Sequence, residues 1–168
     1  MLASLMVAEN IAFYLIAAVM VVAAIRVVTT RNIVHAALYL VLVLAGVAGQ
    51  YILLAAEFVA VTQVLVYIGA IVVLFLFGIM LTRAPTGPMD DSNQEQRVVG
   101  GVIAVGLLGL MGYVLWKAYK GTQFVDLQVQ TTQQVSDSIF STYLIPFEII
   151  SVVLLAALIG AIVLARRD

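Results

Sequence analysis

The sequence has no cysteine, one histidine, three prolines and few charges. Without cysteine, the 168 residues cannot form a disulfide or hold an iron–sulfur cluster or zinc ion through thiolates. A single histidine also excludes a bis-histidine haem within this chain. Charged residues make up 10% of the sequence, against about 25% in soluble domains. The net charge of -1 provides no basic field, so we expect no nucleic-acid partner.

Hydrophobic residues make up 64% of the sequence and gather in five long runs. A membrane-spanning helix needs about 20 mostly apolar residues, and each run approaches that length. The predicted spans are residues 10–28, 33–54, 58–81, 98–116 and 145–165. Each must be helical, because an isolated strand would leave backbone groups unpaired in lipid. The sequence therefore predicts a single all-α integral membrane domain over residues 1–168.

Basic residues are distributed unequally between the two sets of span ends. One set carries Arg26, Arg31, Arg83, Arg97, Arg166 and Arg167, and the other carries Lys117 and Lys120. The positive-inside rule then predicts an external N-terminus and a cytoplasmic C-terminus. Loop 83–96 would be cytoplasmic and loop 117–144 periplasmic. In the latter, Val125, Leu127 and Val129 alternate with polar residues, which predicts a short strand. The short link between spans two and three predicts an antiparallel hairpin.

Small residues in several spans indicate helix packing. Span four carries Gly101, Gly106, Gly109 and Gly112, while Ala45 and Gly49 in span two and Ala156 and Gly160 in span five have small-xxx-small spacing. These faces favour a subunit of a larger assembly. No internal repeat is visible, which argues against a self-contained transporter built from inverted repeats.

Acidic side chains lie near span ends or in loops, with Glu57 starting span three and Glu148 in the first turn of span five. The favoured interpretation is an interfacial position for both, and the alternative is a contact with a proton path or a partner subunit. No ionisable residue lies near a midplane. If the protein serves proton transport, other chains must therefore supply the buried titratable groups.

Span three combines polar and small residues in mid-membrane. Gln63 and Tyr67 are four apart, which predicts a shared face, and Gly69 and Ala70 follow. Glycine tolerates departures from ideal helix geometry, so this segment could change its winding as π-bulges do at functional sites. On the residues alone, an ordinary small-residue packing face is favoured over such a switch.

The residues of span three, EFVAVTQVLVYIGAIVVLFLFGIMLT from Glu57 to Thr82, closely resemble the third helix of subunit J of bacterial proton-pumping NADH:quinone oxidoreductase, respiratory complex I. The mitochondrial counterpart is subunit 6. RNIVHAALYLVLVLAGVAGQYILLAAEF resembles the family's second helix, and PFEIISVVLLAALIGAIVLARR its last. Span four and the outer loop match in hydropathy and position alone. The similar subunit of the photosynthetic complex that accepts electrons from ferredoxin ranks second, because its third helix differs after the glycine.

The resemblance implies a multi-pass subunit of the bacterial cytoplasmic membrane, in the membrane arm beside subunits A, H, K and N. The chain would hold no metal or cofactor and have no catalytic residue, while partner subunits hold FMN, iron–sulfur clusters and quinone. A π-bulge would cover Tyr67, Ile68, Gly69, Ala70 and Ile71. Its conversion to regular helix would couple quinone reduction to proton pumping. Some relatives carry glutamate where this chain has Gln63, and glutamine cannot titrate.

We therefore expect a coupling subunit of the oxidoreductase, with Gln63, Glu57 and Glu148 as candidate polar or proton-path contacts. A small transporter or channel acting alone would require a midplane ionisable residue or an inverted repeat. A passive scaffold in the same complex would show only assembly defects when Gln63 or Tyr67 is replaced. An independent hydride-transfer enzyme is disfavoured, because no phosphate-binding glycine loop follows a strand.

Overall fold

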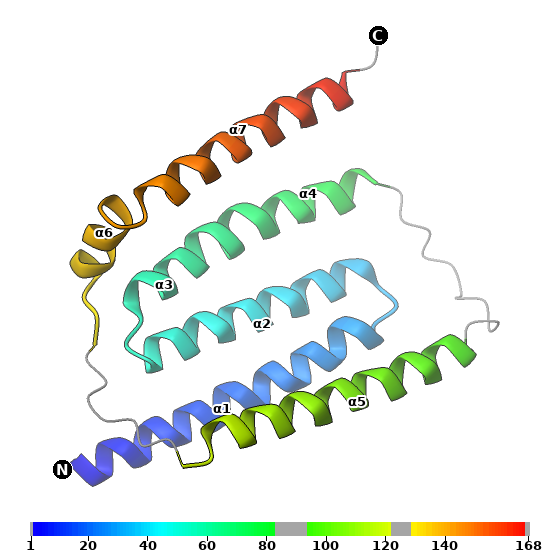
Figure 1. Cartoon of the computed structure of the whole chain (residues 1–168). Coiled ribbons are helices and arrows are strands. Elements are labelled where there is room, and N and C mark those ends of the chain that lie inside the picture. The colour runs from blue at the N-terminus through cyan, green and yellow to red at the C-terminus, as the bar shows by residue number, and fades with distance from the viewer. Residues whose placement is uncertain (1, 83–93, 122–128, 167–168) are drawn as a thin grey trace. The chain divides into compact units, whose positions relative to one another are not determined.

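The computed structural model describes residues 2–82, 94–121 and 129–166, and most of these residues lie in helices (Figure 1). Within these ranges, five helical segments are long and apolar enough to cross a membrane. They are Val7–Thr29, Ile33–Leu53, Glu57–Leu81, Val98–Tyr119 and Leu144–Ala165. The predicted all-α class and the number of spans are confirmed. The orientation of the termini stays a prediction.

The first two spans are α1 (Leu2–Thr29) and α2 (Ile33–Leu53), which pack against each other. Asn32 ends the link between them and caps α2: its side-chain oxygen accepts the N–H groups of Val34 at 2.9 Å and His35 at 3.3 Å. Satisfying two otherwise unpaired N–H groups fixes where the helix begins. In α2, a Cβ added to Gly46 would lie 2.3 Å from Cγ of Met20 in α1. Glycine therefore permits the close approach of these two helices.

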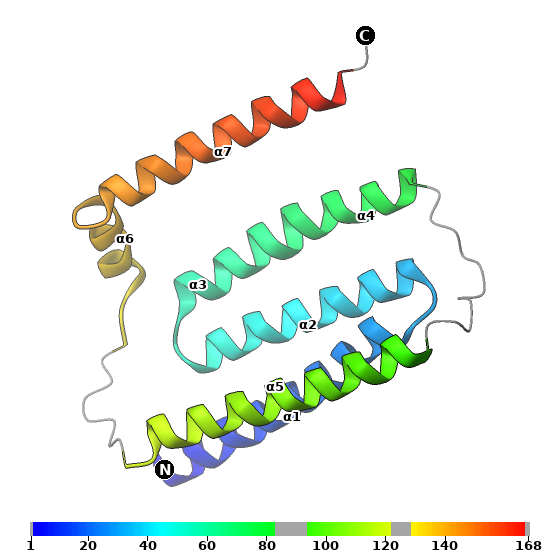
Figure 2. The ribbon, with the colours of Figure 1, turned by 45° about the vertical axis from the view of Figure 1, so that its right-hand side comes forward.

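The third span consists of α3 (Glu57–Thr62), the π-helical segment η1 (Gln63–Val72) and α4 (Val73–Leu81). A three-residue link turns the chain back from α2, and Ala55 adopts a left-handed φ of 54° there. The N–H of Ala56 donates to the carbonyl of Tyr51 at 2.9 Å, a bond that closes the end of α2 as in a Schellman motif. Figures 1 and 2 show α2 between α1 and the third span, which confirms the predicted hairpin.

A short helix within residues 117–144 was absent from the sequence prediction. This helix, α6 (Thr132–Phe140), begins with a capping box in which Thr131 and Gln134 each bond the other's backbone N–H. It contacts α3 and α7 (Leu144–Ala165), and the rings of Phe140 and Phe147 meet edge to face at 5.3 Å. Residues 117–144 were predicted only as a loop, so α6 is an addition to that prediction. The predicted strand lies at 125–129, where residues 125–128 are outside the described ranges and Val129 has no regular structure.

The fourth span, α5 (Gln94–Tyr119), belongs to a separate compact unit, Thr82–Gln128, and is considered by itself. From Val98 onward its side chains are exposed within the chain. At its end, Nζ of Lys120 lies 4.7 Å from the centre of the Trp116 ring, a cation–π contact. Both side chains suit a membrane interface, where the apolar part of a side chain contacts lipid and its polar end contacts water.

Candidate functional site in the third span

The third span changes from α-helix to π-helix and back. The π-helical segment η1 covers ten residues, Gln63–Val72, and includes all five positions predicted for a π-bulge, Tyr67 to Ile71. It extends four residues before them and one residue beyond. π-Helical turns are rare and are found frequently at functional sites. A coupling role for these five residues stays a prediction.

The burial pattern of the span shows what the π-helix does. The less exposed positions after Gln63 are Ile68, Val72, Leu76 and Ile79, so the steps along the span are five, four, four and three residues. The first step is longer than an α-helical turn of 3.6 residues, and the later ones match it. Because i→i+5 hydrogen bonding widens the turn, η1 displaces the packing face by one residue.

Tyr67 therefore lies differently from the sequence prediction. A regular helix would bring it onto the packing face with Gln63, four residues earlier. Tyr67 is instead 48% exposed, and the half-buried position that follows Gln63 is Ile68. The predicted shared face is wrong for this conformation, because the prediction used α-helical spacing across a π-helical segment.

Gln63 is the buried polar residue of the site, with 7% of its surface exposed. Among the described residues, α2 is the one element that contacts η1 apart from the adjoining α3 and α4. The amide group of Gln63 therefore lies between spans two and three rather than against lipid. This position fits the cost of leaving a polar group in hydrocarbon, which is lower between helices than on the lipid face.

In this conformation, no steric clash requires glycine at position 69. A Cβ added there would lie 3.4 Å from the carbonyl oxygen of Val64, an ordinary van der Waals contact. That oxygen belongs to the residue five positions earlier. The structural reason for glycine is consequently its tolerant backbone, which adapts to changes of helix winding more readily than other residues.

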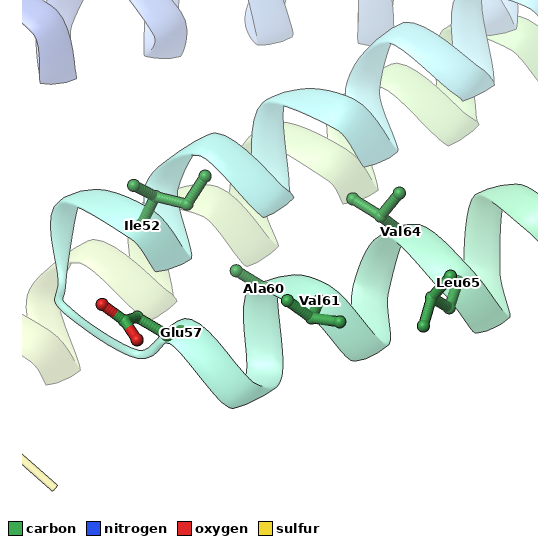
Figure 3. Close-up of a pocket in the computed structure, with 6 residues that line it drawn as sticks. All are labelled: Ile52, Glu57, Ala60, Val61, Val64 and Leu65. Carbon is green, nitrogen blue, oxygen red and sulfur yellow. The ribbon is translucent and has the colours of Figure 1, made fainter. Parts of the chain in front are cut away.

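Glu57 lies at the end of an apolar groove between the end of α2 and the start of the third span (Figure 3). It is the first residue of α3, and its carboxylate is exposed. The groove has a volume of about 440 Å³. Its lining residues are Ile52, Glu57, Ala60, Val61, Val64 and Leu65. Glu57 and Gln63 thus belong to the same short stretch of span three.

Glu148 does not join them. Helix α7 begins at Leu144, so Glu148 is its fifth residue and lies in the second turn rather than the predicted first turn. Within the described ranges, α7 contacts α6 and has no contact with η1. In the same ranges, no three histidine, aspartate or glutamate side chains gather as a metal site would require.

Two features of the site were missed from the sequence. One is the extension of the π-helix to Gln63, and the other is the burial of Val72. No local signal separates these positions, because valine and isoleucine fill the segment and either face would be apolar. The capping box of α6, Thr131 to Gln134, was a readable signal for that helix.

Comparison with known proteins identifies the family. The sequence profile described as NADH-ubiquinone/plastoquinone oxidoreductase chain 6 matches residues 23–164. The chain is 40% identical over 162 residues to NAD(P)H-quinone oxidoreductase subunit 6 of the Paulinella chromatophora organellar chromatophore, covering 95% of this chain and 79% of the relative.

Two further relatives are named subunit J. The chain is 40% identical over 163 residues to F(420)H(2) dehydrogenase subunit J of Methanosarcina mazei, covering 95% of this chain and 92% of the relative. It is 37% identical over 163 residues to NADH-quinone oxidoreductase subunit J of Rhodobacter capsulatus, covering 93% and 81%. The resemblance seen in span three extends over nearly the whole chain, and the protein belongs to the family of NADH-quinone oxidoreductase chain 6, also called subunit J.

Proposed function

We propose that the chain is a coupling subunit in the membrane arm of a proton-translocating NADH:quinone oxidoreductase. The matched family and the relative named NADH-quinone oxidoreductase subunit J support this assignment. The named relatives include NAD(P)H, F(420)H(2) and NADH enzymes. Subunits of one family thus serve enzymes with different electron donors, which fits a role away from the donor site.

In this proposal the chain has no catalytic residue, and its partner subunits hold FMN, the iron–sulfur clusters and the quinone. Subunits A, H, K and N are the proposed neighbours. The chain lies in the bacterial cytoplasmic membrane, with its N-terminus outside and its C-terminus in the cytoplasm. Its five apolar spans and the unequal arginine distribution support this placement.

The observation that carries the proposal is the five-residue step from Gln63 to Ile68. Rewinding η1 to a regular α-helix would remove the extra residue of this turn. Each residue turns an α-helix by about 100°, so the rest of the span would rotate by roughly that angle about its axis. The face toward α2 would then change from Val72, Leu76 and Ile79 to Ile71, Phe75 and Gly78.

This rotation changes both polarity and volume next to α2. Tyr67 would turn toward the face that already holds Gln63, giving two hydrogen-bonding side chains on one side of the span. Gly78 would replace Ile79 and leave a gap. A buried water needs about 30 Å³ and two or more polar partners, and the regular helix supplies more of both than the π-helix does. The two windings would thus differ in hydration, with the apolar residues from Val66 to Phe75 excluding water in the π-helical state.

Replacing Gly69 with leucine tests the switch. Exchange of glycine for a good helix former changes helix stability by about 1 kcal/mol, which would shift an equilibrium between windings by about fivefold. We expect Gly69→Leu to assemble normally and to translocate fewer protons per quinone reduced. The measurement is proton uptake in vesicles carrying the purified complex, with quinone reduction followed in the same sample.

Gly160→Leu in α7 is the matched control, because a Cβ at Gly160 meets no atom within 4 Å, and one at Gly69 meets only the ordinary contact with the Val64 carbonyl oxygen. It should leave the proton yield unchanged. Normal proton translocation by fully assembled Gly69→Leu complex would refute the switch.

A further inference from the structure

The groove beside Glu57 has the composition of a lipid-binding site. Five of its six lining residues are apolar, and the sixth is the carboxylate of Glu57 (Figure 3). The carboxylate marks one end, next to the link between α2 and α3, and Leu65 marks the other. Because Glu57 is the first residue of the membrane span, the groove runs from the boundary of the membrane into its hydrocarbon.

The dimensions of the groove match an acyl chain more closely than a whole helix. Leu65 lies eight positions after Glu57, about 12 Å at 1.5 Å per residue, which approaches the roughly 15 Å depth of one hydrocarbon leaflet. A 12 Å length of helix with a diameter of about 10 Å would fill roughly 900 Å³. The groove offers about 440 Å³. A single acyl chain is thin enough to lie in it, and it enters from one leaflet as the groove does.

The carboxylate selects the headgroup. Within the described residues, no basic side chain forms an ion pair with Glu57. An acidic group at the membrane boundary attracts a cationic headgroup and repels an anionic one. A primary ammonium offers three N–H donors to a carboxylate oxygen, as lysine does, whereas a quaternary ammonium offers none.

We propose that this groove binds one acyl chain of a phospholipid with a primary ammonium headgroup, of the phosphatidylethanolamine class, with the ammonium beside Glu57. The headgroup end of the groove lies outside η1, because Ile52 belongs to α2 and Glu57, Ala60 and Val61 belong to α3. Only Val64 and Leu65, at the far end of the groove, come from η1. Its occupant fills an apolar surface that would otherwise contact mixed boundary lipid.

Photochemical labelling in the assembled complex tests the proposal. The complex is placed in vesicles of equal parts phosphatidylethanolamine, phosphatidylcholine and phosphatidylglycerol. In each of three samples, one of these lipids carries a trace of a chain-borne diazirine. An exposed ion pair alters binding by about two- to fivefold, so the ethanolamine probe should label the Glu57–Leu65 peptide by that factor more than the other two probes.

Three variants separate the parts of the site. Glu57→Gln should remove the preference for the ethanolamine probe. Val61→Trp should lower labelling by all probes, because Val61 lines the groove and is 57% exposed. Val59→Trp is the matched control: it changes the same residue type in the same helix, 42% exposed, outside the lining, and labelling should stay unchanged.

Equal labelling by the three probes, or a preference that survives Glu57→Gln, would make the occupant an ordinary boundary lipid and overturn the proposal. A peptide that no lipid probe labels, together with a cysteine at position 61 that cross-links to another protein chain, would assign the groove to a partner helix. That result also overturns the proposal.

Discussion

At the scale of single residues, the contact between α1 and α2 depends on the missing side chain of Gly46. The sequence pointed to Ala45 and Gly49 as the small residues of span two, by their four-residue spacing. Gly49 does lie near α1, where an added Cβ would be 3.3 Å from Cδ1 of Ile16. Ala45 is exposed, and the tightest contact lies at its neighbour. Spacing identifies a face to within one residue, and side-chain shape decides the rest.

Gly46→Ala should therefore weaken the α1–α2 pair. The added Cβ would lie 2.3 Å from Cγ and 2.7 Å from Sδ of Met20, so Met20 must move. Overpacking of this kind costs about 1–3 kcal/mol. We expect a lower melting temperature and less assembled complex on native gels.

Met20→Ala in the same chain should restore much of the loss, because it removes the atoms that clash with the new methyl group. Gly160→Ala, where the added Cβ meets nothing within 4 Å, should have no such effect. If Met20→Ala fails to improve Gly46→Ala, the clash is not the cause of the defect.

At the scale of the element, the third span holds one more residue in η1 than a regular helix would need for the same packing face. Deleting Ala70 should remove that residue and let the segment rewind to α-helix. Val72, Leu76 and Ile79 would keep their places against α2. We expect the deletion variant to assemble at near wild-type amounts and to lose coupled proton translocation, measured as protons moved per quinone reduced.

A deletion of Phe75 in α4 is the control. It removes a residue where the helix is already regular, so the packing face beyond it rotates by about 100° while η1 remains. Assembly should then fall. Equal proton yields from the Ala70 deletion and the wild type would contradict a functional role for the change of winding.

The position of this site along the chain was predicted more accurately from the sequence than its geometry was. The run Tyr67-Ile68-Gly69 marked the segment, and the structure places it within η1. The displacement of the packing face to Ile68 and Val72 was not predictable from the sequence. Apolar β-branched residues occur on both sides of the helix, so the hydropathy pattern does not distinguish the buried face from the exposed one. Helix α6 was missed for another reason. A nine-residue polar helix is too short for a hydropathy search to detect, and its capping box was the one sequence signal that indicated it.

At the scale of the whole molecule, hydropathy predicted the five spans well because lipid imposes the same demand on each of them. Every backbone N–H and C=O in hydrocarbon must be paired within the segment, which makes length and apolar content sufficient signals. Contacts between spans follow no such rule. The packing of α2 between α1 and the third span depends on Gly46, Ala48, Ala60 and the buried Gln63, whose roles emerge from shape.

The orientation of the whole chain is testable with reporters at its C-terminus. The excess of arginine at one set of span ends predicts a cytoplasmic C-terminus. A fluorescent protein fused after Asp168 should therefore fold and fluoresce, and alkaline phosphatase at the same position should be inactive. A fusion to the loop near Lys120 should show the reverse pattern. Phosphatase activity at the C-terminus would invert the topology.

The two links that join the first three spans are three residues long, 30–32 and 54–56. Three residues reach at most about 10 Å, a third of the roughly 30 Å hydrocarbon core. During synthesis, each short link keeps the end of one span close to the start of the next. A span that failed to insert would therefore keep the following span from reaching its position in the bilayer. The first three spans must therefore insert into the membrane together. A single defective span among them would prevent insertion of the other two.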